Sequence, residues 1–193
     1  MSNIIKLTGE IVSIGNNYVD HKGNAMYNVM VESRRHSGMA DTLRVVVPDS
    51  EWHPCKVGDS VEILGRIQSR NVLAKGRNRL VLEVIADSKF VKMDDLGWDY
   101  NEVEVEKAYV VKDPILRQTP MGKTICDVMI AINHDGRSSY VPTIGWGEVA
   151  MKLSKLHVGD CIYDVRGRFQ SRDYQKTLTD DAGIEYQVTR TAY

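Results

Sequence analysis

Short runs of β-branched and other apolar residues, separated by turn-forming residues, are the main pattern along this chain. Five such runs occur in the first part of the chain, at residues 6–12, 28–31, 41–47, 60–64 and 79–85. Each run is too short for a typical helix and is rich in Val, Ile or Thr, and the run at 41–47 ends at the turn pair Pro48-Asp49. The pattern therefore predicts about five strands in this region.

A second set of similar segments follows in the same order, which indicates an internal duplication. Residues 57–70 contain Val-Gly-Asp and then Gly-Arg-Ile-Gln-Ser-Arg, and residues 158–172 contain Val-Gly-Asp and then Gly-Arg-Phe-Gln-Ser-Arg. Two more pairs of segments correspond, 23–31 with 122–130 and 79–85 with 183–189. One extra residue separates Gly-Asp from Gly-Arg in the second copy, and it predicts a β-bulge in that strand.

The helical signal is weak and falls in the second copy alone, at residues 147–156. The corresponding segment of the first copy, 49–56, contains Pro54 and is predicted to be an irregular loop. Five short strands with a helix or loop between the third and the fourth are typical of the OB-fold barrel. We therefore predict an all-β protein made of two tandem OB-fold five-stranded barrels, with a short helix in the second copy.

The predicted domain boundaries follow from the break in the strand pattern around Trp98. They are residues 1–96 for the first barrel, 97–102 for the linker and 103–193 for the second barrel. The last strand of the second copy stops earlier than that of the first, so we expect this strand to be truncated.

The composition is that of a soluble globular protein, with 42% hydrophobic and 26% charged residues. A net charge of −1 gives no overall basic character, so any nucleic-acid site must depend on local clusters of Lys and Arg. The three cysteines form no CxxC pair, and no apolar run approaches the ~20 residues of a membrane span. We expect a cytoplasmic protein with reduced thiols and no membrane segment.

Motifs of catalysis are absent from the sequence. His53 and Cys55 lie close together, but a zinc site needs a second pair of ligands, and none is apparent. No Gly-rich phosphate loop, GxSxG or HExxH motif occurs. The sequence therefore predicts no enzyme, no metal and no cofactor.

Three segments of the second copy together carry a family resemblance. Residues 112–122 read Lys-Asp-Pro-Ile-Leu-Arg-Gln-Thr-Pro-Met-Gly, residues 141–150 place Trp146 before Gly and Ala, and residues 167–174 read Gly-Arg-Phe-Gln-Ser-Arg-Asp-Tyr. In this order they resemble the bacterial single-stranded DNA-binding protein (SSB) family over nearly all of residues 103–193. The first copy matches more loosely and has Val72 opposite Tyr174.

The resemblance implies an aromatic platform for DNA bases, with cations for the phosphates. A single-strand binder that ignores sequence needs flat rings for stacking, and the family's stacking positions fall on Tyr140, Trp146 and Tyr174. The predicted phosphate-binding residues are Arg66, Arg70, Lys75, Arg77, Arg117, Arg137, Arg166, Arg168, Arg172 and Lys176. Among the other aromatics, Tyr27, Tyr109 and Tyr163 are interpreted as packing residues, and Trp52 and Trp98 fit either role.

The leading hypothesis is a non-catalytic protein that coats and protects single-stranded DNA in replication, recombination or repair. The second copy is expected to dominate binding because it holds the aromatics. Relatives combine four OB domains, so the resemblance implies a homodimer, with replication and repair proteins as further partners. Two alternatives stay open: a replication-accessory OB module that docks protein partners, and an RNA-binding OB protein.

Overall fold

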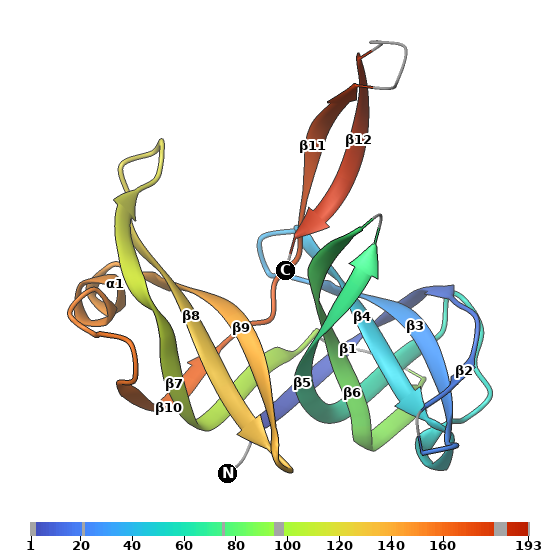
Figure 1. Ribbon diagram of the computed structural model, residues 1–193. Coiled ribbons are helices and arrows are strands. Elements are labelled where there is room, and N and C mark those ends of the chain that lie inside the picture. Colours follow the sequence, from blue (N-terminus) through green and yellow to red (C-terminus); the bar gives the residue numbers. More distant parts are fainter. Residues whose placement is uncertain (1–2, 21, 75, 95–98, 180–184, 193) are drawn as a thin grey trace.

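The computed structural model is an all-β protein with one short α-helix, as predicted (Figure 1). It describes the backbone of residues 3–20, 22–74, 76–94, 99–179 and 185–192, and the side chains of these residues except 74, 77 and most of 173–192. Ten of the described strands form one hydrogen-bonded sheet, and the last two form a separate hairpin. No helix within the described ranges is long and apolar enough to cross a membrane.

The first half of the chain forms a closed five-stranded barrel. Its elements are β1 (Asn3–Ile14), β2 (Tyr18–Val19), β3 (Ala25–Arg34), β4 (Ala40–Pro48), the 3-10 helix η1 (Asp49–Glu51), β5 (Ser60–Ala74) and β6 (Arg77–Met93). All five predicted runs lie in these strands. The barrel closes because β1 pairs with both β3 and β5, β3 with β4, β4 with β6, and β6 with β5.

The second half begins with the same order of strands. Its elements are β7 (Asn101–Gln118), β8 (Thr124–His134), β9 (Arg137–Trp146), α1 (Glu148–Leu153), β10 (Cys161–Gly167), β11 (Arg172–Thr179) and β12 (Glu185–Ala192). β7, β8 and β9 form a meander, and β10 pairs with β7. α1 lies inside the predicted helical segment, and β7 begins within the predicted linker 97–102.

The last two strands differ from the sequence prediction. Residues 183–189 were expected to match 79–85 and to close a second five-stranded barrel, but β12 pairs with β11 in a hairpin that projects from the body (Figure 1). Ala192 lies opposite Arg172, whereas in the first half Val81 lies opposite Arg70. Ala192 therefore takes the position of Val81. The predicted correspondence of 183–189 with 79–85 is wrong, because the β11–β12 hairpin is longer than the β5–β6 hairpin.

The predicted β-bulge is also not found as a register shift. The ladder between β10 and β7 runs from Cys161–Gly167 to Val103–Tyr109 without a slip, whereas the equivalent β1–β5 ladder joins Ile5–Glu10 to six residues of β5. Both strands are thus one residue longer in the second half. The irregularity is confined to Asp164, whose φ of 52° lies in the left-handed region.

An approximate twofold relationship joins the two halves. β1 and β7 pair antiparallel, with Ile5 directly opposite Val103, the residue that takes its place in the second half. The Asn3 side chain bonds both backbone groups of Ile67, at 2.8 and 3.2 Å. Asn101 bonds Phe169 in the same way, at 2.7 and 3.0 Å. The strand pair β1–β7 is therefore the centre of a pseudosymmetric joint.

The repeated Gln-Ser-Arg segments cross this joint. The Ser69 hydroxyl accepts a bond from the Tyr140 amide at 2.7 Å, and the Ser171 hydroxyl accepts one from the Thr42 amide at 2.8 Å. Thr42 and Tyr140 occupy matching places in β4 and β9. The serine of each Gln-Ser-Arg segment therefore makes an equivalent hydrogen bond to the other half. One continuous cluster contains buried apolar residues from both halves, among them Ile5 and Val103.

Aromatic packing closes one end of the first barrel. Trp52 stacks on Tyr27 with ring centroids 4.2 Å apart and on Phe90 at 5.7 Å. The Tyr27 hydroxyl donates to Asp49 at 3.0 Å, and this bond raises the pKa of the tyrosine. Tyr27 is therefore a packing residue, as predicted, and Trp52 takes the packing role.

Candidate nucleic-acid interface

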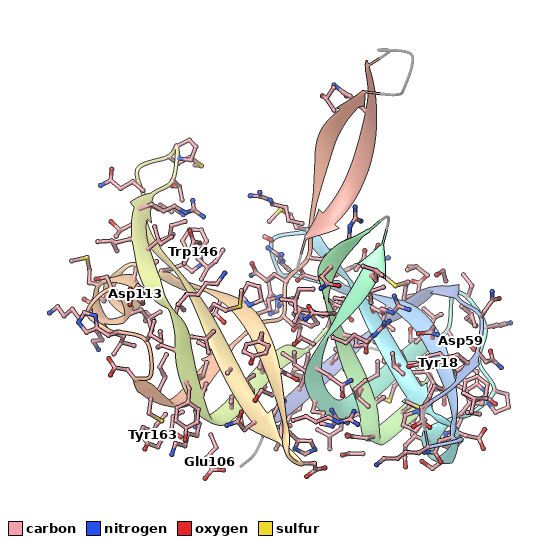
Figure 2. All side chains as sticks on the ribbon, in the orientation of Figure 1. Tyr18, Asp59, Glu106, Asp113, Trp146 and Tyr163 are labelled. Atoms are coloured by element: carbon pink, nitrogen blue, oxygen red, sulfur yellow. The ribbon has the colours of Figure 1, made fainter. Side chains whose placement is uncertain are left out.

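Exposed aromatic and apolar side chains alternate along β9. Tyr140, Ile144 and Trp146 are 44, 47 and 52% exposed, while Val141 and Gly145 between them are buried. Because successive side chains of a strand point to opposite faces, the three exposed residues share the outer face of the sheet. Figure 2 shows Trp146 on the half of the molecule formed by β7, β8 and β9. Two of the three predicted stacking residues thus lie on one exposed face.

The neighbouring strands extend this surface. Residues directly opposite each other in antiparallel strands share a face, so the register defines rows across the sheet. Four rows run from β9 through β8 to β7, namely Trp146–Ile125–Arg117, Ile144–Asp127–Ile115, Pro142–Met129–Lys112 and Tyr140–Ala131–Tyr109. We call this surface the β7–β9 face. It combines two exposed aromatic rings with two exposed cations, Arg117 and Lys112, and Ile115 adds a side chain that is 63% exposed.

Arg117 pairs with a carboxylate on this face. Its guanidinium makes two bonds to Asp127, one of them at 3.0 Å from Nη2 to Oδ1. These bonds raise the pKa of Arg117, which is a cation at any physiological pH. Both side chains are exposed by more than a third, so this ion pair contributes little to stability.

Arg168 of the repeated motif is engaged between the halves. Its Nε lies 3.0 Å from Oδ2 of Asp41, a carboxylate with no exposed surface. Arg35 and the backbone amide of Ser171 also donate to Asp41. Burial alone would raise the pKa of Asp41, but these bonds outweigh it and the pKa is lowered. Arg168 therefore fixes β4 to the segment after β10, and its phosphate role remains a prediction.

The matching arginines of the first half are also paired. Arg66 Nε lies 2.7 Å from Asp87, and Arg70 Nε lies 3.0 Å from Glu83, which is 1% exposed. Arg66 and Arg70 are four residues apart in β5, and their ladder partners place them on the same outer face of the strand. Both arginines are thus partly neutralised by the barrel itself, and Arg172 is the exposed member of the repeated set.

The remaining predicted cations are scattered. Arg137 is exposed at the start of β9, and Arg166 is exposed on β10 opposite Glu104. Lys75 lies outside the described residues, as do the side chains of Arg77, Tyr174 and Lys176. Of the predicted set, the structure brings together Tyr140, Trp146 and Arg117. No cluster of His, Cys, Asp and Glu suited to a metal ion occurs in the described part of the chain.

Sequence reasoning missed two features of the surface. Ile144 belongs to the exposed stripe, and the every-second-residue spacing from Tyr140 to Trp146 was the signal that would have found it. Tyr163 was interpreted as packing, but it is 63% exposed on β10. The Lys107 ammonium lies 5.1 and 5.5 Å from the ring centroids of Tyr109 and Tyr163, a cation–π arrangement that no single-strand pattern indicates.

The fold and this surface define an OB-type β protein that presents an aromatic sheet face. Residues 107–190 match the sequence model of the Single-strand binding protein family. The matched range contains β8, β9 and most of β7, so it includes the β7–β9 face.

Solved structures share this fold over most of the chain. The wild-type single-stranded DNA binding protein from Thermus aquaticus superposes with a TM-score of 0.73 at 22% identity, covering 89% of this chain and 86% of that one. A deletion variant of the same protein gives the same score and identity, with 89 and 87% coverage. No curated protein matches the sequence significantly.

Proposed function

We propose that this protein binds single-stranded DNA on the β7–β9 face, with bases stacked on Trp146 and Tyr140 and phosphates directed toward Arg117. The observation that carries the proposal is the exposed stripe Tyr140–Ile144–Trp146, which lies within the residues that match the SSB family. A soluble surface gains nothing from exposing two aromatic rings and an isoleucine on one strand unless they meet a ligand.

The chemistry of this face suits binding that ignores sequence. Each base stacked on an aromatic ring contributes about 1–3 kcal/mol, whatever its identity, because every base has a π-face. The rows of the sheet let a flexible DNA strand lie across several rings. The long side chain of Arg117 then reaches toward the sugar-phosphate backbone of the DNA. Apart from the Asp127 carboxylate, the rows contain no acidic group to repel phosphate.

The biological role follows from this chemistry. A protein that covers bases and backbone protects exposed single strands during replication, recombination or repair, and proteins of those processes are its expected partners. We propose a homodimer as the working form, in which two chains supply two β7–β9 faces to one strand.

A protein-docking role is the second candidate, and one observation favours it. The net charge is −1, and Arg66, Arg70 and Arg168 are all paired with carboxylates, which leaves fewer cations for a polyanion than a strong binder uses. In that case the stripe on β9 would contact an apolar partner surface. RNA is a further alternative ligand, because the same rings accept its bases.

Titration with oligo-dT and with matched oligo-rU, followed by tryptophan fluorescence at two salt concentrations, tests the proposal. Binding of dT is expected to quench the fluorescence and to weaken as salt rises, because each phosphate contact releases counterions. Absence of binding to dT at low salt would contradict the proposal and favour the docking role. Equal affinity for rU would extend the ligand class to RNA.

Trp146→Ala is the matching variant. It removes the ring that stands at the end of the stripe, so we expect a loss of about 1–3 kcal/mol, or roughly 5- to 150-fold in Kd, measured by anisotropy of labelled dT. Tyr100→Ala is the control, because Tyr100 is 57% exposed but precedes β7 and lies outside the rows of the β7–β9 face. Equal losses in the two variants would show that the β7–β9 face is not the binding surface.

A further inference from the structure

The strand that carries the proposed stacking rings, β9, has a ladder on one of its edges. Among the described strands it lies at the end of the ten-stranded sheet and pairs with β8. Its counterpart β4 pairs with β3 on one edge and with β6 on the other, at Val45 and Val46. In an antiparallel pair every second amide of a strand points away from its neighbour, so an end strand needs acceptors from elsewhere. The position of β9 therefore depends on contacts from outside its own ladder.

Ser69 of β5 supplies such a contact at Tyr140. The Tyr140 amide donates to the Ser69 hydroxyl at 2.7 Å, and the Ser69 amide donates to the Ser139 hydroxyl at 3.2 Å. One serine of the first half thus bonds two successive residues of β9, and Figure 1 shows β5 and β9 next to each other where the halves meet. Two bonds at adjacent residues fix both the position and the rotation of the β9 backbone at Tyr140.

Trp146, the other proposed stacking residue, is held by the second half itself. It lies about 20 Å from Tyr140 along the strand, at the usual rise of about 3.3 Å per residue. Trp146 is opposite Ile125 in the β8–β9 ladder, and the Gly147 amide donates to the Thr124 carbonyl at 3.0 Å. Loss of the Ser69 hydroxyl is therefore expected to disturb Tyr140 and to leave Trp146 in place.

The place of the Tyr140 ring follows from the backbone that carries it. The side chain is 44% exposed, so neighbouring side chains enclose the ring on part of its surface only. A shift or rotation of β9 at this residue moves Cβ and, with it, the plane on which a base would stack. Binding groups lose much of their effect when they lie more than about 0.5 Å from the productive geometry.

We infer that Ser69 is a positioning residue for base stacking: through its hydroxyl, the first half holds Tyr140 in the place where a base of single-stranded DNA stacks. The inference rests on the proposed function and gives Ser69 a role that needs no contact with DNA. It also assigns a part in binding to the repeated Gln-Ser-Arg segment of the first half, by way of the joint between the halves.

The pseudosymmetric serine provides a matched comparison. The Ser171 hydroxyl accepts a bond from the Thr42 amide at 2.8 Å, and the Ser171 amide donates to Asp41 at 2.9 Å. Ser69 and Ser171 thus make the same two kinds of bond across the joint, but β4 has Thr42 where β9 has Tyr140. Loss of the Ser171 hydroxyl therefore weakens the joint in the same way without displacing a stacking ring.

A double-mutant cycle, measured by anisotropy of labelled dT, tests the inference. Ser69→Ala is expected to weaken binding roughly 2- to 10-fold, the range that one neutral hydrogen bond spans. In the Tyr140→Ala background the same change is expected to have no effect on affinity, because the ring that it displaces is absent. Ser69→Thr keeps the hydroxyl and is expected to bind dT as the wild-type protein does.

A merely structural role for Ser69 predicts a different result. Ser69→Ala and Ser171→Ala each remove one bond across the joint, so both are expected to lower the urea midpoint. Coupling to the ring distinguishes them, since Ser171→Ala is expected to change affinity by the same factor with and without Tyr140. Equal coupling of both serines to Tyr140→Ala would refute the inference, because the effect would then come from the joint as a whole.

The outcomes separate the inference from the proposed function. If the wild-type protein does not bind dT, or if Tyr140→Ala binds it equally well, stacking on Tyr140 fails and the positioning role fails with it. If Tyr140→Ala weakens binding, but Ser69→Ala has no effect or has the same effect with and without the ring, the positioning role is refuted and the proposed function stands. A loss in Ser69→Thr as large as that in Ser69→Ala would contradict a role for the hydroxyl. A loss that requires the ring and is absent in Ser69→Thr establishes the positioning role.

Discussion

At the scale of single residues, Asp41 links the two halves through a buried carboxylate. It has no exposed surface, and it accepts bonds from Arg35, Arg168 and the Ser171 amide, which come from both halves. The pseudosymmetric position in β9 holds Ser139, whose hydroxyl accepts a bond from the Ser69 amide at 3.2 Å. One side of the joint is therefore ionic and the other is neutral.

This arrangement predicts a loss of stability in acid. The pKa of Asp41 is lowered in the folded protein, so its contribution is complete above the unfolded value of about 3.9 and is lost as the pH falls through the folded value. Asp41→Asn is expected to cost about 3–5 kcal/mol at neutral pH, since it leaves two arginines without their buried partner. Urea unfolding between neutral pH and about pH 3 measures both effects.

Asp164→Asn is the control for this substitution, because Asp164 is exposed on β10. It should leave the urea unfolding midpoint at neutral pH unchanged. A variant Asp41→Asn that unfolds with the wild-type pH profile would contradict the role given to the ion pair.

At the scale of elements, the two Gly-Arg motifs lie in different surroundings. A Cβ atom on Gly65 of β5 would lie 1.9 Å from the carbonyl oxygen of Ile85, where β5 and β6 lose register. A Cβ atom on Gly167 of β10 would meet no atom within 4 Å. Close backbone packing therefore requires a glycine at position 65, whereas position 167 has room for a larger side chain.

Alanine substitution separates these two cases. Gly65→Ala forces the backbones of β5 and β6 apart, and we expect a loss of about 3 kcal/mol or more in the free energy of unfolding. Gly167→Ala is expected to change it by no more than about 0.5 kcal/mol. Urea midpoints of the two variants provide the comparison, and equal midpoints would contradict the packing described for β6.

The strands could be predicted from the sequence because each carries its own signal. Alternation and β-branched residues mark β1, β3, β4, β5 and β6, and the duplication carries that prediction into the second half. The role of the repeated Gln-Ser-Arg could not be predicted, because the partners of Ser69 and Ser171 are far away in the sequence. Repetition pointed to a DNA contact, whereas a twofold joint equally requires the same groups from each half.

The candidate site was predictable to a similar extent. Tyr140 and Trp146 emerged from the family resemblance, and β9 places both on one face. The ion pair between Arg44 and Glu83 carried no such signal, since it depends on the pairing of β4 with β6. Charge neutralisation of Arg66, Arg70 and Arg168 likewise depends on carboxylates brought near by the fold.

At the scale of the whole molecule, the two strands that join the halves, β1 and β7, already have neighbouring strands on both of their edges. β1 pairs with β3, β5 and β7, and β7 pairs with β1, β8 and β10. A second chain therefore cannot repeat the β1–β7 contact without opening it. A homodimer must instead use another surface, such as the outer side of the sheet where Tyr163 and Lys107 are found.

Light scattering measures the assembly directly. We expect a mass of twice the 21.8 kDa of one chain at micromolar concentration. A mass of one chain would contradict the homodimer and would leave a single β7–β9 face per particle.

The joint between the halves also has an evolutionary consequence. When two identical subunits meet across a twofold axis, every mutation at the contact appears on both sides at once, so an acidic residue such as Asp41 would be matched by a second copy of itself. Covalent linkage of the two halves in one gene removes that constraint. Asp41 and Ser139, or Pro48 and Trp146, can therefore differ although they occupy matching places. Two halves joined in one chain can in this way give different chemistry to surfaces that an identical pair of subunits would have to share.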